Sequence, residues 1–362
     1  MADNFQLDFL AVEAKKSGDA ISIRYEVGGK TYIHVIDGGY VDTGESLRNH
    51  IIAYYGNPAH IDNVIVTHND GDHACGLIPI LEHFGVGALW MLRPWLYAEE
   101  LLPSFKRYTN VDNLRKVLRA AYSNLAALEE LAESKGIPIY EPFQGASIGV
   151  FRVMAPTRAR FLELVITSNK TPEERAQDTS LSEMFSAFVE KAKNAVSLII
   201  AGWGVESFPA EGTSNENEMS VVQYAQIDGE NILLTGDTGR NGLAEVIAYA
   251  PYVGLILPGI NRFQVPHHGG RRNVNTELLD SLLGERLAEP LAAGNFYAYV
   301  SSAKADEDHP RKVVERAVIH RGGSLFKTEG TTICAKSHNA ARRDGWGTLT
   351  PVSYPTVLES DD

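Results

Sequence analysis

The sequence is poor in three features, each of which would indicate a particular class of protein. It has only two cysteines, Cys75 and Cys334, far apart in the chain, so neither a disulfide framework nor a thiolate metal site is expected. No run approaches the roughly 18 consecutive apolar residues that a membrane-spanning helix needs. The first ten residues lack the basic and apolar segments of a signal peptide. We therefore expect a cytoplasmic protein without a membrane partner.

Positive charge is also scarce. The 33 Lys and Arg residues against 46 Asp and Glu give a formal net charge of −13. Such a protein lacks the broad basic surface that grips long nucleic acids, although local cations in a cleft can still attract a phosphate group. The length of 362 residues, with 44% apolar and 22% charged residues, fits an ordinary globular enzyme that buries its own core.

Alternating and helical apolar patterns predict a chain of mixed strands and helices. We expect one domain over 1–340, with a mostly helical insertion at about 90–195, and an irregular C-terminal tail at 341–362. The strands are predicted at 8–12, 20–27, 31–36, 63–67, 195–200, 220–225, 231–234, 262–265 and 296–300, with a last hairpin formed by 324–326 and 331–334. The helices are predicted at 47–55, 109–135, 171–193, 242–250 and 311–321.

Four potential metal ligands occur within six residues, directly after a predicted apolar strand. They are His68, Asp70, Asp72 and His73. Imidazole nitrogen and carboxylate oxygen suit Zn²⁺, Mn²⁺ or iron, and a carboxylate in place of an imidazole shifts the preference towards harder ions such as Mn²⁺. A polar turn that only caps the next helix would account for one aspartate, but not for two histidines and two aspartates together.

Two further strand ends carry potential ligands. Asp237 follows the predicted strand 231–234, and His267 with His268 follows the predicted strand 262–265 in a Gly-rich loop. Taken alone, a Gly-Asp pair indicates a turn more often than a ligand. Three strand ends that present ligands together predict a metal site.

These motifs, in this order, resemble the metallo-β-lactamase superfamily, and most closely its ComEC-type branch. In that branch the usual His-x-His-x-Asp-His becomes His-x-Asp-x-Asp-His, as at 68–73. The likeness covers about 10–90 and 195–335, and it implies an α/β (α+β) fold, a four-layer αββα sandwich with the metals at one sheet edge. The other matching segments are Ser17-Gly18-Asp19-Ala20, Ile36-Asp37-Gly38-Gly39, Leu233-Leu234-Thr235-Gly236-Asp237, Val265-Pro266-His267-His268-Gly269 and His309-Pro310.

The resemblance implies two divalent cations, zinc or manganese, and a set of ligands for each. Asp37 would order the metal loop without binding metal. One of the two adjacent histidines would complete the shell of the second ion; His268 is favoured because related enzymes place Gly-His-Gly there, and His267 remains the alternative. The other implied ligands are His68 and Asp70 for the first ion, Asp72 and His73 for the second, and Asp237 as the bridge.

Two positions depart from the family pattern. Most relatives have a third-motif histidine about one strand before the bridging aspartate, where this chain offers only Asn215 and Asn217, which are weaker neutral ligands. We therefore expect the first ion to be loosely held or replaced. Gly270 stands where ComEC-type sequences commonly have serine, which removes a hydroxyl that could contact a phosphate.

Residues around these motifs are the candidates for catalysis and substrate binding. Two cations roughly 3.5–4 Å apart would lower the pKa of a shared water and supply hydroxide at neutral pH. Asp72 and His309 are the candidate catalytic residues, and His309 would steady the transition state or protonate the leaving oxygen. Alone, His309 is more often a helix-start or surface histidine. The candidates for substrate binding are Arg271, Arg272, Lys304 and Asn217, with Arg311 nearby, although a single cation is more often a solvated surface charge.

The hypothesis that follows is a metal-dependent hydrolase that acts on a phosphodiester, in nucleic acid or a nucleotide, through a metal-bound hydroxide. An ester, thioester or lactone hydrolase of the same fold is the alternative, which a small apolar pocket without converging Arg or Lys would favour. Another alternative is a non-catalytic, metal-binding regulatory protein. In either case the helical insertion is a candidate docking surface for a second copy or a protein partner. An oxidoreductase is less expected, because no flavin-binding segment is apparent.

Overall fold

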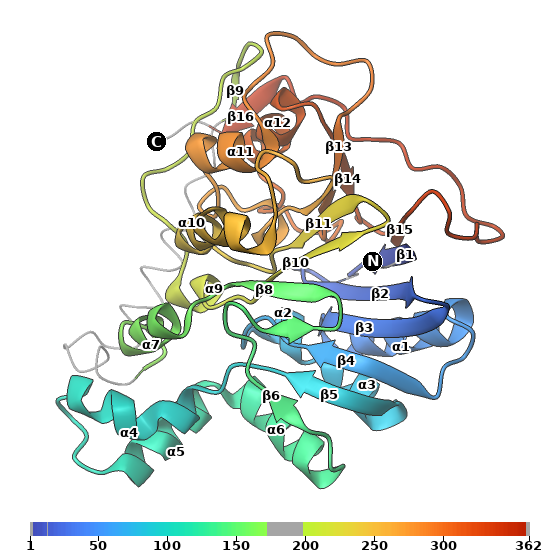
Figure 1. Ribbon diagram of the computed structural model, residues 1–362. Helices are drawn as coiled ribbons and strands as arrows, with labels where there is room; N and C mark the ends of the chain where they lie inside the picture. The colour runs from blue at the N-terminus through green and yellow to red at the C-terminus, as the bar shows by residue number, and fades with distance from the viewer. Residues whose placement is uncertain (1–2, 13, 172–197, 360–362) are drawn as a thin grey trace.

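The computed structural model describes residues 3–12, 14–171 and 198–359. Two large β-sheets pack against each other, and helices cover the outer side of each sheet (Figure 1). This arrangement confirms the predicted mixed α/β fold and is consistent with the four-layer sandwich. Among the described helices, none combines the length and the apolar character that crossing a membrane requires.

The first sheet has seven strands and contains the N-terminal half of the fold. Its strands β3 to β6 are parallel, whereas β15, β1, β2 and β3 pair in antiparallel fashion. The strands lie in the order β15 (Ile333–Lys336), β1 (Asn4–Phe9), β2 (Ala20–Val27), β3 (Lys30–Gly38), β4 (His60–Ile65), β5 (Gly85–Trp90) and β6 (Ile139–Tyr140).

The second sheet also has seven strands, and its strands β11 to β14 are parallel. Their order is β14 (Gly323–Lys327), β13 (Phe296–Val300), β12 (Arg262–Gln264), β11 (Glu230–Leu234), β10 (Val222–Ile227), β8 (Phe151–Ala155) and β7 (Ser147–Ile148). In β13, Phe296, Ala298 and Val300 join the core under the helices, while Tyr299 faces the other sheet and stacks on Phe9 with a centroid separation of 4.9 Å.

Helices on the first sheet include α1, α2, α3 and α6, and those on the second include α10, α11 and α12 (Figure 1). The helix bounds are α1 (Val41–Tyr54), α2 (Gly71–Ala74), α3 (Leu77–His83), α4 (Ala98–Leu101), α5 (Val111–Ala121), α6 (Ser123–Ser134), α7 (Arg158–Ile166), α9 (Asn215–Glu218), α10 (Arg240–Tyr249), α11 (Thr276–Leu283) and α12 (Lys312–His320).

The range 109–135, predicted as one helix, forms two. Helices α5 and α6 are separated at Tyr122, whose ψ of 52° is not helical. The Tyr122 side chain is buried, and its hydroxyl contacts the sulfur of Met219 at 3.8 Å. The apolar spacing continues across this break, so the sequence pattern cannot reveal it.

The hairpin predicted from 324–326 and 331–334 is wrong. Strand β14 pairs with β13 in the second sheet, whereas β15 pairs with β1 in the first, so the connection crosses from one sheet to the other. The predicted irregular tail at 341–362 contains β16 (Val357–Glu359), which pairs with β9 (Leu198–Ile200). In each case the true partner is distant in sequence, and local turn signals cannot identify it.

The predicted insertion at about 90–195 is only partly separate from the sheets. Helices α4 to α7 lie in it, but β6 extends the first sheet, and β7 and β8 form one edge of the second. The helix predicted over 171–193 lies, apart from its first residue, outside the described residues.

The parallel strands position the site. Strands β3 and β4 of the first sheet run in one direction, as do β11 and β12 of the second. Because the carboxyl ends of parallel strands meet at the same sheet edge, the loops after these four strands gather together. They carry Asp37, the 68–73 motif, Asp237 and the His267-His268 pair.

Three glycines allow the metal loop to pack directly on the backbone of its neighbours. Gly76 lies just after α2, and a Cβ there would overlap the carbonyl group of Gly38 at the end of β3. A Cβ on Gly44, in α1, would overlap the backbone of Gly76. The helix that carries Asp72 and His73 is therefore held against β3 by contacts that no larger residue permits.

We predict that Gly76→Ala destabilises the protein by roughly 1–3 kcal/mol or more, because overpacking against backbone cannot be relieved by a side-chain rotation. Urea denaturation measures this loss. Gly212→Ala is the matched control, since a Cβ at Gly212 meets no heavy atom within 4 Å. Equal stability of the two variants would contradict the proposed backbone contact.

A buried ion cluster joins α12 to the loop before α9. Glu206 accepts hydrogen bonds from His320 at 2.7 Å and from Arg321 at 2.8 Å, and all three side chains are inaccessible to solvent. Burial raises the pKa of the Glu206 carboxyl, but the hydrogen bonds from His320 and Arg321 outweigh it and lower this pKa to about 2. The folded state therefore favours the ionised form more strongly than the unfolded state does.

The Glu206 contribution to stability is complete above the ordinary glutamate pKa of 4.5 and is lost as the pH falls from 4.5 towards 2. We predict that Glu206→Gln lowers the free energy of unfolding at pH 7 by roughly 2–3 kcal/mol, and that this difference from the wild type shrinks at pH 3. Urea denaturation at both pH values tests this, with the exposed Glu211→Gln as control. A difference that is independent of pH would refute the assignment.

Candidate metal centre

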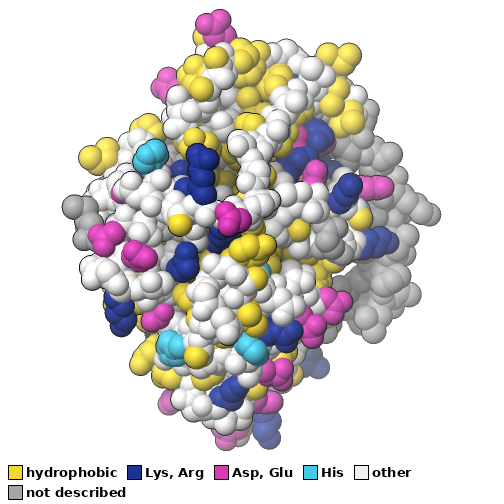
Figure 2. Space-filling view, turned by 90° about the vertical axis from the view of Figure 1, so that its right-hand side faces the viewer, with side chains coloured by type: hydrophobic (Ala, Val, Ile, Leu, Met, Phe, Trp, Pro, Cys, Tyr) yellow, Lys and Arg dark blue, Asp and Glu magenta, His cyan; other side chains and the backbone are white. Residues whose placement is uncertain are grey.

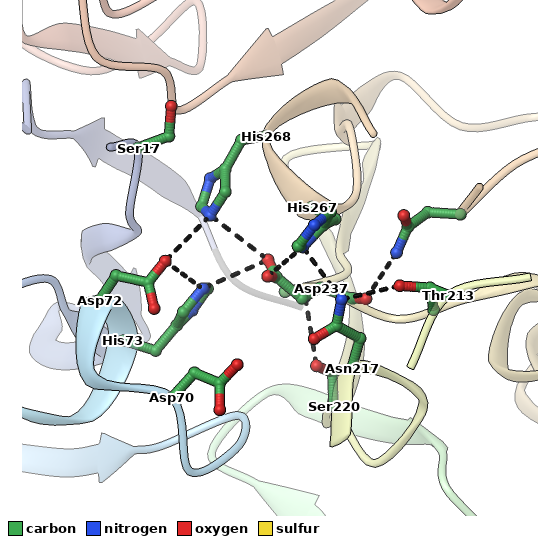
Figure 3. A network of polar contacts seen from close by, with 12 residues as sticks. Ser17, Asp70, Asp72, His73, Thr213, Asn217, Ser220, Asp237, His267 and His268 are labelled. Carbon is green, nitrogen blue, oxygen red and sulfur yellow. Dashed lines mark hydrogen bonds and ion pairs between the residues drawn. The ribbon is translucent and has the colours of Figure 1, made fainter. Parts of the chain in front are cut away.

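The structure brings all seven predicted ligands to the edge where the four strand ends meet. Figure 3 shows six of them around one point, from α2 and the loops after β4, β11 and β12. The seven are His68, Asp70, Asp72, His73, Asp237, His267 and His268.

Asp72, His73, His268 and Asp237, which we call the second pocket, have the spacing of a tetrahedral site. His73 Nε2 lies 3.3 Å from Asp237 Oδ1 and 3.9 Å from Asp72 Oδ2. His268 Nε2 lies 3.6 Å from Asp72 Oδ2 and 3.7 Å from Asp237 Oδ1. Four donors at about 2 Å from a tetrahedral ion are about 3.3 Å apart, so a small contraction would fit Zn²⁺ or a similar cation.

Unpaired buried atoms point to the same place. His68 Nε2, His73 Nε2, His268 Nε2 and Asp237 Oδ1 are each buried without a hydrogen-bond partner. Buried polar atoms are normally paired, and an unpaired one costs about 1–3 kcal/mol. Cations that accept electron pairs from these atoms, in one pocket or both, would remove this cost, so the donor set fits divalent metal.

His68, Asp70 and Asp237, which we call the first pocket, are more widely spaced. His68 Nε2 lies 3.8 Å from Asp70 Oδ2 and 3.9 Å from Asp237 Oδ2. Asn217, considered as a replacement ligand, directs its amide nitrogen to Thr213 at 2.8 Å and to His267 at 3.2 Å. The other candidate asparagine, at 215, bonds instead to the backbone carbonyl of residue 167. The first pocket therefore has a sparser donor set than the second.

Hydrogen bonds from outside the two pockets orient the ligands. Asp37 contacts His73 Nδ1 at 2.8 Å and accepts from the backbone and hydroxyl of Thr67, which directs His73 Nε2 towards Asp237. Such a bond fixes the tautomer and the ring of a metal-binding histidine. Ser220 Oγ accepts from the Asp237 backbone at 3.2 Å and lies 3.3 Å from His68 Nδ1.

Strained backbone is concentrated at the same edge. Asp37, His267 and His268 have φ angles of 55°, 49° and 53°, a left-handed conformation that side chains larger than glycine rarely adopt. Such strain persists where the surrounding structure imposes it, and it is often found at functional sites. Here it turns the two adjacent histidines in different directions. His268 points into the second pocket, while His267 lies beside the other oxygen of Asp237.

The electrostatics show an excess of buried carboxylate. Burial lowers the pKa of His268, but Asp237 and Asp72 outweigh it and raise this pKa to about 9. His73 shows the same balance, and its pKa is raised well above the ordinary value by Asp237 and Asp37. Burial raises the pKa of Asp72, yet His73 and His268 bring it down to about 2. The carboxylates of the second pocket therefore favour positive charge beside them, and a divalent cation would supply it.

The predicted catalytic and substrate-binding residues outside the two pockets differ in their exposure and in their contacts. His309 lies beside the paired histidines, with ring centroids 5.1 Å from His267 and 6.2 Å from His268, and Asp306 is 3.5 Å from its Nδ1. Burial lowers the pKa of His309 despite the opposing effect of Asp306. The cations at 272 and 304 are exposed, the arginine at 271 is half-buried, and the arginine at 311 pairs with Asp308.

Sequence reasoning missed two residues at this edge. Asp19, at the start of β2, is buried within 4.8 Å of Asp37 and His73, and one of its carboxylate oxygens has no hydrogen-bond partner. Its segment was recognised as a family motif, but no role was given to it. Lys170 places its Nζ 2.6 Å from Asp70 Oδ1. Nothing in the sequence around Lys170 indicates this contact.

We predict that removing metal with a chelator lowers the thermal unfolding midpoint and that added Zn²⁺ or Mn²⁺ restores it, because a ligand bound only by the folded state stabilises that state. His73→Ala and Asp237→Asn should lose both the metal and this response. Differential scanning fluorimetry and elemental analysis measure the two quantities, with the exposed His83→Ala as control. Full metal retention by Asp237→Asn would exclude this site.

Comparisons with solved structures give low scores. A hydrolase of the β-lactamase superfamily called AbOPH matches with 12% identity and a TM-score of 0.31, over 60% of this chain and 56% of that one. A variant of the β-hydroxylase CmlA matches with 11% identity and a TM-score of 0.41, over 92% and 54%. A Thermotoga maritima protein, provisionally described as a metallo-beta-lactamase, matches with 11% identity and a TM-score of 0.31, over 70% and 94%.

This chain thus spans little more than half the length of the first two structures. No curated protein matches the sequence. The model of the metallo-beta-lactamase superfamily matches residues 23–139, which include β3, β4 and the 68–73 motif, and this match supports the superfamily that the motifs resemble.

Proposed function

We propose that the protein is a metal-dependent hydrolase that cleaves a phosphodiester bond in a nucleic acid or a nucleotide. The observation that carries the proposal is the second pocket, in which unpaired nitrogen and oxygen atoms lie at the spacing of metal ligands. The first pocket would hold a further cation, with Asp237 between the two, and zinc or manganese suits such ligands. The ComEC-type His-x-Asp-x-Asp-His pattern supports a phosphate substrate.

Divalent cations held by these residues would supply Lewis acidity and would lower the pKa of bound water enough to make it a nucleophile at neutral pH. The chain's own residues orient the reaction. Asp37 orients the His73 ring, while Asn273 donates to the backbone carbonyl of Asp237 at 2.9 Å and holds the backbone of the residue that would bind metal. Asp306 orients His309 through Nδ1, which leaves Nε2 to exchange a proton with the substrate or water.

Charge on the surface favours a compact substrate over a long polymer. The face shown in Figure 2 carries basic and acidic side chains interspersed, without a continuous basic stripe. Together with the net charge of −13, this offers little phosphate-backbone grip on that face. A nucleotide or a short strand end would need only the metal-loaded pocket itself.

The binding of a protein partner or a second copy to the helical insertion remains a prediction.

One observation favours an ester, thioester or lactone substrate instead. A small cavity beside His68 is lined mainly by apolar side chains, among them Leu92, Tyr122, Phe161 and Met219, and its lining includes no Lys or Arg. Its volume of about 10 Å³ holds no more than a water molecule. It would have to widen to accept an acyl group, so we rank this activity second.

The first test is an activity panel with the metal-loaded protein. We expect turnover of bis-p-nitrophenyl phosphate, dinucleotides or cyclic nucleotides, and loss of that turnover in Asp72→Asn and His73→Ala. Aryl esters, thioesters and lactones in the same panel test the second activity. A loaded protein that turns over none of these compounds would refute both hydrolase assignments and would favour a non-catalytic, metal-binding protein.

The second test concerns His309. We predict that His309→Ala lowers kcat by roughly 10²-fold or more, the usual effect of removing a proton-transfer group, while the metal content stays unchanged. His83→Ala is the control histidine. If His309→Ala also loses metal, the residue contributes to the metal pocket and the proposed role is incorrect.

A further inference from the structure

Lys170 is held in place beside the first pocket by a short, well-bonded segment. It follows α7, and its backbone donates to Ser168 Oγ at 3.0 Å, while Ser168 in turn donates to the buried Glu216 of α9. The Lys170 Nζ lies 2.6 Å from Asp70 Oδ1, and both side chains are about one third exposed. The backbone of Lys170 is thus anchored beside the first pocket, and its ammonium group is paired with Asp70.

Lys170 competes with a cation for the same carboxylate. Asp70 presents Oδ1 to Lys170 and Oδ2 to His68, so one of its two oxygens is already engaged by a positive charge. A divalent ion entering the first pocket would meet both a weakened ligand and a repelling ammonium group.

The other residues of the first pocket do not make up for the ligand strength that Asp70 loses to Lys170. Asn217 bonds through its amide nitrogen to Thr213 and His267, so it can offer this pocket only a neutral amide oxygen. The ionisable donors that face the pocket among the described residues are His68, Asp70 and Asp237. The second pocket has four donors and its Asp72 faces two histidines. Each pocket has two carboxylates, but the first has one imidazole fewer, and only its Asp70 is paired with a lysine.

We propose that Lys170 takes the electrostatic place of a first-pocket cation, so that the protein holds one divalent ion tightly in the second pocket and a second ion only weakly. This inference rests on the metal-dependent function proposed above and specifies how that site is loaded. The ammonium group keeps positive charge at the Asp70 end of the site, where an anionic substrate would approach.

The test counts bound metal and needs no substrate. Full-length protein is stripped with a chelator, titrated with Co²⁺ while its visible absorption is followed, and desalted after Zn²⁺ loading for elemental analysis. We expect the wild type to retain one equivalent and to bind a second in a separate, weaker phase. Lys170→Met should retain two, with the weaker phase tightened by about tenfold or more, because one charge-assisted hydrogen bond no longer competes for Asp70. Lys170→Arg should behave like the wild type.

The control is Lys116→Met, which removes an exposed lysine on α5, and thermal unfolding checks that each variant is folded. Two tightly held ions in the wild type, or one in Lys170→Met, would overturn the role of Lys170 and leave the hydrolase proposal standing. Absence of bound metal from every protein would overturn both proposals. The expected metal counts without hydrolysis of any substrate would support Lys170 and defeat the proposed function alone.

Discussion

The buried carboxylate of Asp237 is the constraint around which the site is organised. It is almost fully removed from solvent, and one of its oxygens has no hydrogen-bond donor although imidazole nitrogens surround it. An isolated buried carboxylate is strongly unfavourable, so such an arrangement persists only where positive charge compensates it. The orientation of His73 by Asp37 and the anchoring of the Asp237 backbone by Ser220 serve this one arrangement.

Much of the candidate site could be predicted from the sequence, because the proposed ligands stand directly after apolar strands, whose ends can be recognised from local sequence. The adjacent histidines were harder, since sequence alone cannot tell which of two neighbouring rings faces a pocket. In the structure the His268 ring faces Asp72 and Asp237, and both residues have left-handed backbone. The contact of Lys170 could not be predicted from the sequence. Its partner Asp70 is 100 residues away, and the contact depends on how α7 packs.

The fold could be predicted for the same local reasons, and the predictions failed where strands pair with partners that are distant in the sequence. Strand β13 and the turn between β2 and β3 follow the sequence patterns closely. The predicted final hairpin failed because its two strands belong to different sheets, and the long helix failed because Tyr122 turns the chain without interrupting the apolar spacing. Each error concerns tertiary contacts that a short window of sequence does not contain.

The ladder between β1 and β15 has a consequence for biosynthesis. It aligns Gln6 with Lys336, so one edge of the first sheet is completed only after the 330 residues that follow Gln6 have been synthesised. Until then β1 has an open hydrogen-bonding edge and an apolar side that can pair with other nascent chains. Pairings between such remote segments also form slowly. Expression at lower temperature or with chaperones should therefore increase the yield of native protein.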